Sequence, residues 1–111
     1  MVKRAMQEAT FLVLTALAAG SRHGYGIICD VAEISDGRVR LRAGTLYSAL
    51  DRLRLDGLVS VEGEEVVDGR LRRYYRLTAE GSRQLATEAA RLRSNAETAF
   101  ARLGLAQRSA G

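Results

Sequence analysis

Apolar residues recur at helical three-and-four spacing in four stretches of this chain, and short strand-like runs lie between them. The spacing predicts a first helix over residues 3–19, which is apolar on more than one side and is therefore expected at the centre of the domain, with Gly20 as its stop. A second helix is predicted over residues 23–35, capped by Ser21. Its inward residues are expected to be Ile28, Val31 and Ala32, with Tyr25, Ile27 and Ile34 at the margins.

The third helical stretch, residues 43–55, has one apolar side and one side of small, polar and charged residues. The apolar side consists of Leu46, Ala49, Leu50 and Leu53. The other side carries Gly44, Ser48, Asp51 and Arg52, flanked by Thr45, Tyr47 and Arg54. Small residues, hydroxyls and arginines can lie against a polyanion, so this side is typical of a recognition helix for DNA. An ordinary amphipathic helix with a solvated face is an equally good interpretation.

Strand-like runs flank this helix. The alternation of Val39–Leu41 predicts a short strand before it, and residues 58–66 and 71–77 predict a hairpin after it, around the turn signal Asp68-Gly69. A plain two-residue turn would split the apolar residues of the two strands between opposite faces. A bulge is therefore expected, either at Gly63 or at the Gly69 end of the turn.

A long helix is predicted from Thr78, which serves as its cap, with Glu80 in the first turn. Its apolar residues follow a strict heptad seam of Leu85, Ala89, Leu92, Ala96, Ala99 and Leu103, with Phe100 beside it. A helix of roughly 25 residues has too long a seam for a small domain to cover, so self-association is predicted. In the alternative, the seam packs back on the first helix, and both can hold for different parts of it.

Composition indicates one compact domain: 111 residues with a hydrophobic fraction of 47%. No apolar run is long enough to span a membrane and no signal peptide is visible, so a cytoplasmic protein is expected. The net charge is +4, and residues 38–76 hold nine arginines against six acidic residues. This balance is compatible with nucleic-acid binding. In the alternative, the hairpin arginines only pair with Glu62, Glu64 and Glu65 on the facing strand.

Few residues offer other chemistry. The single cysteine, Cys29, cannot form an internal disulfide and is expected in or near the core. His23 has no metal-ligand partners at a suitable spacing, and no catalytic constellation can be assembled, so no metal, cofactor or enzyme activity is predicted. A winged-helix module that binds proteins rather than specific DNA is the alternative function, because fold does not fix function.

Several motifs keep a family's spacing. They are HGYGI at 23–27, GTLYSAL at 44–50, Leu53, GL at 57–58 and RRYYRLTAEG at 72–81. Over about residues 8–85 the chain resembles the PadR family of bacterial transcriptional regulators. The resemblance implies a homodimer that binds a pseudo-palindromic operator, usually as a repressor, and is released by a small aromatic or hydrophobic effector. The family commonly has serine and proline where this chain has Arg42 and Ala43, and proline at Ser48, so the third helix lacks a serine cap and a pre-set first turn.

The predicted class is mainly α with a small β-wing: a winged helix-turn-helix with a long C-terminal dimerisation helix. Residues 1–77 would form the DNA-binding domain, 78–104 the dimerisation helix and 105–111 a frayed tail. Expected major-groove contacts are Thr45, Tyr47, Ser48 and Arg52. Expected contacts to phosphate or the minor groove are Arg40, Arg42, Arg70, Arg72 and Arg73. The dimer interface would use Leu85, Ala89, Leu92, Ala96, Ala99, Phe100 and Leu103 together with the first helix, and an effector pocket there would use Phe11 and Phe100 unless these two are simply core.

Overall fold

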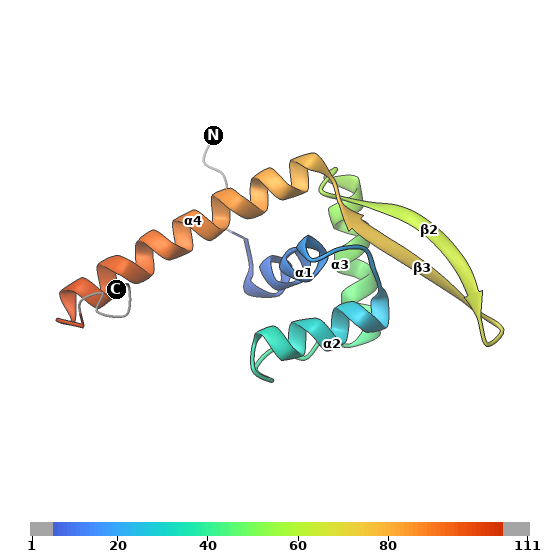
Figure 1. Cartoon of the computed structure of the whole chain (residues 1–111), viewed down its shortest axis with the longest axis horizontal. Helices are drawn as coiled ribbons and strands as arrows, with labels where there is room; N and C mark the ends of the chain where they lie inside the picture. Colours follow the sequence, from blue (N-terminus) through green and yellow to red (C-terminus); the bar gives the residue numbers. More distant parts are fainter. Residues whose placement is uncertain (1–5, 106–111) are drawn as a thin grey trace.

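The computed structural model describes residues 6–105 of the 111-residue chain. In chain order its elements are α1 (Glu8–Ala18), β1 (Arg22–His23), α2 (Gly24–Ile34), α3 (Ala43–Leu55), β2 (Val59–Val67), β3 (Arg70–Leu77) and α4 (Ala79–Arg102). Figure 1 shows α1, α2 and α3 grouped in one body, from which the β2–β3 hairpin and α4 project in opposite directions. The predicted class, mainly α with a small β-wing, is confirmed.

Helix α1 lies at the centre of the core, as predicted, and contacts α2, β3 and α4. Its buried residues are Leu12, Val13, Leu14, Ala16 and Leu17. The predicted start is wrong, because Met6 and Gln7 precede the helix and it begins at Glu8; residues 3–5 lie outside the described part. Short helices depend on tertiary burial, so the helix extends only about one turn ahead of its first buried residue.

Helix α2 begins one residue later than predicted and has a different face inward. His23, not Ser21, is its cap, since Nδ1 of His23 accepts a hydrogen bond from the N–H of Gly26 at 3.3 Å. The buried residues of α2 are Gly24, Ile27 and Val31. The predicted inward residues Ile28 and Ala32 are only half-buried. The buried face of α2 begins at Gly24, and a glycine does not register as an apolar position in the sequence. The spacing of the larger apolar residues therefore indicates the adjacent face of the helix.

The short strand lies before α2 and not before α3. Residues 39–41 form no strand; Arg22 and His23 form β1 instead, which pairs antiparallel with β3 in a sheet of order β1-β3-β2. The link from α2 to α3 is held by the buried Ser35, whose Oγ accepts a hydrogen bond from the N–H of Val39 at 2.9 Å. Val39 and Leu41 still pack partly against the core. Their alternation therefore reflects side-chain burial without a strand partner.

Strands β2 and β3 form an antiparallel hairpin, which we call the wing (residues 59–77). Its turn is made by Asp68 and Gly69, both with positive φ (54° and 77°), as a two-residue hairpin turn requires. The register shifts between Val61 and Gly63, so the bulge is confirmed at the first of its two predicted places. The shift brings together on one face the cross-strand pairs Val59–Leu77 and Val61–Tyr75.

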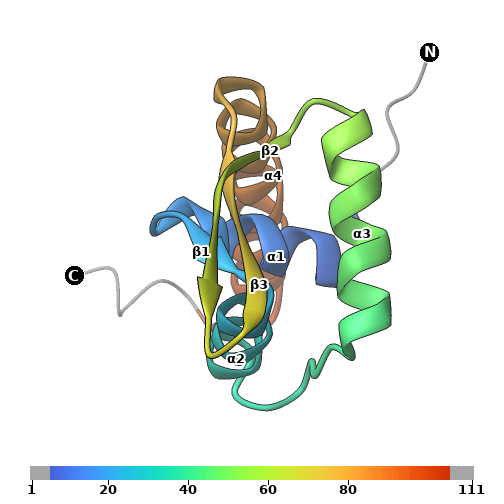
Figure 2. The same ribbon diagram turned by 90° about the vertical axis from the view of Figure 1, so that its right-hand side faces the viewer.

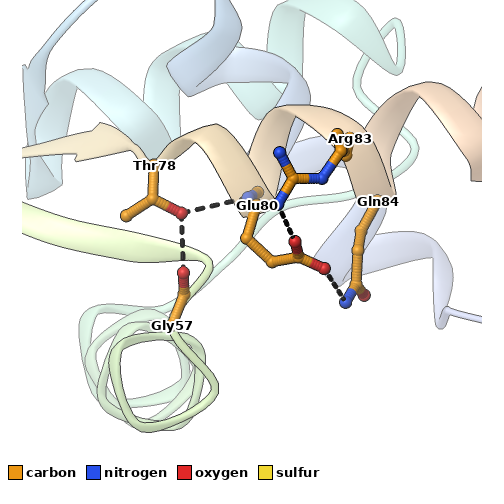
Figure 3. Close-up of polar contacts among 6 residues, drawn as sticks. Gly57, Thr78, Glu80, Arg83 and Gln84 are labelled. Carbon is orange, nitrogen blue, oxygen red and sulfur yellow. Dashed lines mark hydrogen bonds and ion pairs between the residues drawn. The ribbon is translucent and has the colours of Figure 1, made fainter.

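Thr78 caps α4, as predicted, and also ties it to the end of α3. Its Oγ1 accepts a hydrogen bond from the N–H of Gly81 at 3.0 Å, and its hydroxyl donates to the carbonyl oxygen of Gly57 at 2.6 Å (Figure 3). In the same turn Glu80 accepts hydrogen bonds from Arg83 and Gln84. These contacts fix the direction in which α4 leaves the body.

Only the first part of α4 packs on its own chain. Leu85 packs against the core, and Glu88 is buried and paired with Arg91, whose hydrogen bond lowers the pKa of the Glu88 carboxyl. From Ala89 to Leu105 every residue is exposed. The exposed seam residues are Ala89, Leu92, Ala96, Ala99, Phe100 and Leu103. The interpretation that the seam packs back on its own chain therefore holds for the first part of α4, and self-association through the exposed part stays a prediction. Residues 106–111 of the predicted tail lie outside the described part.

Candidate nucleic-acid interface

Helix α3 spans the predicted range and buries the predicted side. Leu46, Leu50 and Leu53 are buried and Ala49 is half-buried. The opposite side is exposed along its whole length, with Gly44, Thr45, Tyr47, Ser48, Asp51, Arg52 and Arg54. Figure 2 shows α3 standing at one side of the molecule, beside the sheet. An exposed helix of 13 residues with a small, polar face can enter a major groove.

Tyr47 connects α3 to the start of α2. Its side chain is 44% exposed, and its hydroxyl end lies so close to Gly24 that a Cβ there would stand 2.2 Å from Oη. Gly24 thus supplies the space that the phenol ring occupies. The remaining exposed part of the ring is available at the surface.

The two arginines before α3 are placed differently. Arg42 is the N-cap residue, but its side chain makes no cap hydrogen bond and is exposed. No side chain therefore caps α3, whose N-terminus can receive an anion together with Arg42. Arg40 lies over the preceding loop, where a Cβ on Gly37 would be 3.1 Å from its Nη2. Arg42 is thus the freer of the two for a phosphate contact.

The wing carries four arginines. Arg76 donates from Nη1 to the carbonyl oxygen of Leu77 at 3.1 Å, and of the other three one forms an ion pair and two do not. Arg73 Nε donates to Glu64 Oε2 at 2.9 Å, a contact that also raises the pKa of Arg73. Arg70 and Arg72 form no ion pair with any residue in 6–105. The interpretation that wing arginines only pair with facing acids is therefore right for Arg73 and wrong for the other two.

A groove with a volume of about 490 Å³ separates the wing from the starts of α2 and α3. It is lined by His23, Gly24, Tyr25, Tyr47, Val67, Asp68, Arg70, Leu71, Arg72 and Arg73. Three arginines against one carboxylate make its walls positive. Ser48 and Arg52 do not reach this groove; they border a separate cleft of about 530 Å³ between α3, α1 and α4. The predicted contact residues thus occupy both flanks of α3, and the wing joins only one.

Two residues of α2 are more exposed than the sequence pattern predicts. Tyr25, which the sequence pattern places at the margin of the buried face, is 70% exposed and lines the groove. Cys29, expected in or near the core, is exposed one turn further along, and a hydrogen bond between the two raises the pKa of Tyr25. Both follow from the inward face of α2, which starts at Gly24 and turns positions 25 and 29 outward.

Other chemistry is sparse in the described residues. Among residues 6–105 no three His, Cys, Asp or Glu side chains gather as metal ligands. None of the helices in this range is both long and apolar enough to cross a membrane. Phe11 packs partly against the core, whereas Phe100 is 45% exposed near the end of α4.

Comparison with known proteins agrees with this geometry. A model described as the transcriptional regulator PadR-like family matches residues 13–87. The transcriptional regulator Rv3488 of Mycobacterium tuberculosis is 46% identical over 61 residues, which are 55% of this chain and 43% of that protein. The match thus spans less than half of that relative's length.

Solved structures agree in fold. A PadR-like transcription factor from Bacteroides fragilis is 30% identical, with a TM-score of 0.68 over 81% of this chain and 84% of that one. Bacillus subtilis PadR in complex with operator DNA is 20% identical, with a TM-score of 0.65 over 73% of this chain and 46% of that one, a likeness that shows the fold alone.

Fold and site together define a winged helix-turn-helix protein in which α3 has an exposed polar side and the wing carries arginines. Since the family model covers more than half of the chain, the chain belongs to the PadR-like family of transcriptional regulators. The resemblance found in the motifs is confirmed.

Proposed function

We propose that this protein is a homodimeric transcriptional repressor that binds a pseudo-palindromic operator through α3 and the wing. One observation carries the proposal: the exposed side of α3 is bordered by arginines that no carboxylate neutralises. Arg42, Arg52, Arg70 and Arg72 form no ion pair within residues 6–105. Unpaired arginines on one side of a small basic domain are what a DNA backbone requires.

In this proposal, α3 and the wing contact different parts of the duplex. Thr45, Tyr47, Ser48 and Arg52 would face base edges in the major groove, and Arg42 would meet a phosphate at the start of α3. The wing arginines would reach the backbone or the minor groove beside it. Bacillus subtilis PadR, which shares the fold, was solved in complex with operator DNA.

Dimerisation would use the uncovered seam of α4. Two copies joined there would present two α3 helices to successive turns of the duplex, about 34–36 Å apart. Phe100 of one copy could then meet Phe11 of the other and line a pocket for a small hydrophobic or aromatic effector that releases the DNA. A regulator of this kind would act where the chromosome lies, in the cytoplasm.

The test is selection of bound sequences from random duplex DNA at fixed salt, followed by affinity measurements over a salt series. We expect an enriched pseudo-palindrome. The double variant Arg70→Ala with Arg72→Ala should bind more weakly, and its salt slope should fall by about 0.9 for each phosphate that an arginine no longer neutralises. Arg93→Ala is the matched control, since Arg93 is exposed on α4, away from the groove.

Two results would count against the proposal. An unchanged slope in the double variant would remove the wing from the interface. Failure to enrich any sequence, with weak salt dependence, would favour a winged-helix module that binds proteins.

A further inference from the structure

His23 joins the helical body to the wing through three contacts. Its backbone lies opposite Tyr74 in the β1–β3 pairing. Its Nδ1 accepts the hydrogen bond from Gly26 that caps α2. Its imidazole meets the Tyr74 ring edge to face, with ring centroids 5.4 Å apart and an interplanar angle of 85°.

Tyr74 is held equally firmly on its other side. Its hydroxyl donates to Glu65 Oε1 at 2.7 Å, and Glu65 lies opposite Arg72 in the hairpin register. The contacts therefore run from β1 across β3 to β2. Along β3, Tyr75 follows Tyr74 towards the body and is buried. Residues 70–73 precede Tyr74 towards the tip of the wing, and none of them is buried. The His23–Tyr74 contact thus lies where the wing leaves the body.

Gly24, the residue after His23, faces α3. The hydroxyl end of the Tyr47 ring lies against the backbone of Gly24. The first turn of α2 therefore contacts α3 through Gly24 and the wing through His23. We propose that His23 is a positioning residue that fixes the wing's orientation relative to α3, so that Arg70 and Arg72 meet the backbone while α3 occupies the groove. The proposal rests on the DNA-binding function proposed above.

The variants separate the ring contact from the cap. His23→Asn keeps a good N-cap and removes the ring, whereas His23→Phe keeps a ring and removes the acceptor. Tyr74→Leu removes the same ring contact from the wing side. Cys29→Ser is the control, because Cys29 is exposed on α2 and does not line the groove.

The first measurement is the salt slope of binding to a duplex selected with the wild-type protein. His23→Asn and Tyr74→Leu should each lower the slope by about two, the contribution of two phosphate contacts. The double variant should lower it no further, because either change alone releases the wing. His23→Phe and Cys29→Ser should keep the wild-type slope.

The second measurement needs no DNA. Residual dipolar couplings of backbone amides report the orientation of β3 relative to α2 and α3. His23→Asn should change the couplings of residues 70–74 relative to those of the helices. Unchanged couplings and slope in both ring-deleting variants would overturn the proposal, even if melting temperature falls, because His23 would then be a cap alone. If the wild-type protein binds no duplex, the proposed function fails, and the couplings still decide whether His23 positions the wing.

Discussion

The hydroxyl of Tyr47 lies against the backbone of Gly24, so that α2 and α3 touch through a ring on one helix and the absence of a side chain on the other. A Cβ at Gly24 would stand 2.2 Å from Oη and 2.8 Å from Cζ of Tyr47. Both atoms belong to the far end of a half-exposed side chain. The ring can therefore move if that space is filled, and the two helices need not separate.

Gly24→Ala is expected to displace Tyr47 with little loss of stability. The added methyl group meets a mobile ring, and Gly24 has no positive φ that alanine would strain. Operator binding should weaken, since a good base contact contributes about 1–3 kcal/mol. Thermal melting and binding to the selected duplex measure the two effects separately.

Gly81→Ala is the matched comparison. There a Cβ would stand 2.1 Å from the carbonyl oxygen of Leu58, a backbone atom that cannot rotate away. The variant should lose about 1–3 kcal/mol of stability through overpacking, with binding affected only as far as the folded fraction falls. If Gly24→Ala instead melts like Gly81→Ala and its folded fraction binds normally, Tyr47 has no role at the surface.

Much of the fold follows from the sequence, because strong local signals agree with burial. The bounds of α3, the turn at Asp68-Gly69, the bulge at Gly63 and the cap at Thr78 are each set by residues close in the chain. The misplaced strand shows the limit. Residues 22–23 form a strand only because the fold places them beside β3, on the edge that β2 leaves open. Two residues are too few to show an alternating pattern in the sequence.

Glu64→Gln should strengthen binding to duplex DNA. The change removes the carboxylate that holds Arg73 and frees its guanidinium for a phosphate, so the salt slope should rise by about 0.9. Stability should change little, because the pair is exposed to solvent and screened by it. Affinity over a salt series and chemical denaturation provide the two values.

Glu62→Gln separates release of Arg73 from loss of a negative charge. Glu62 lies on the same strand at the bulge and forms no ion pair within residues 6–105. The Glu62→Gln variant should raise DNA affinity slightly, because it removes one negative charge, and it should add no phosphate contact. Equal slopes in the two variants would show that Arg73 stays away from DNA whether or not Glu64 holds it.

Stability should depend on the titration of His23. Burial, and then the nearby charge of Arg72, lower the pKa of His23 from its ordinary value of 6.5. The unfolded chain therefore binds this proton more readily than the folded one. The contribution of neutral His23 is complete above the unfolded pKa and is lost as the pH falls through the lowered folded pKa. Protonation also removes the acceptor for the Gly26 N–H.

The measurement is denaturant unfolding between about pH 7.5 and pH 5, the range in which histidine titrates. Wild-type stability should fall on acidification, and His23→Asn, which caps without titrating, should fall less. The lowered pKa of Glu88 also reduces stability in acid, but only below its ordinary value of 4.5, outside this range. Parallel curves for the two proteins would mean that His23 titrates alike in the folded and unfolded chains.

The candidate site was predictable where it depends on one helix and unpredictable where elements meet. Exposure of Thr45, Ser48 and Arg52 follows from the burial of the leucines on the other side of the same helix. The groove does not follow, because it needs Tyr25 outward, Gly24 beneath Tyr47 and the wing bent across both. The two-residue turn at Asp68-Gly69 already places Glu64 opposite Arg73 and Glu65 opposite Arg72. Which facing acid forms an ion pair does not follow from that register, because Glu64 pairs with Arg73 whereas Glu65 accepts a hydrogen bond from Tyr74.

Leu92→Glu tests whether the outer part of α4 joins two copies. Leu92 is on the heptad seam and, like all residues beyond it up to Leu105, is exposed on its own chain. A carboxylate there should disfavour burial in an apolar interface and shift the protein towards monomer, with little change in the stability of the fold. Ser94→Glu is the control, because two residues turn the helix by about 200° and place the charge away from the seam.

Sedimentation should show a monomer only for Leu92→Glu. That monomer should also lose the advantage of a two-half-site operator over a single half-site. A wild-type protein already monomeric at the concentrations that bind DNA would exclude this seam as the source of paired recognition helices.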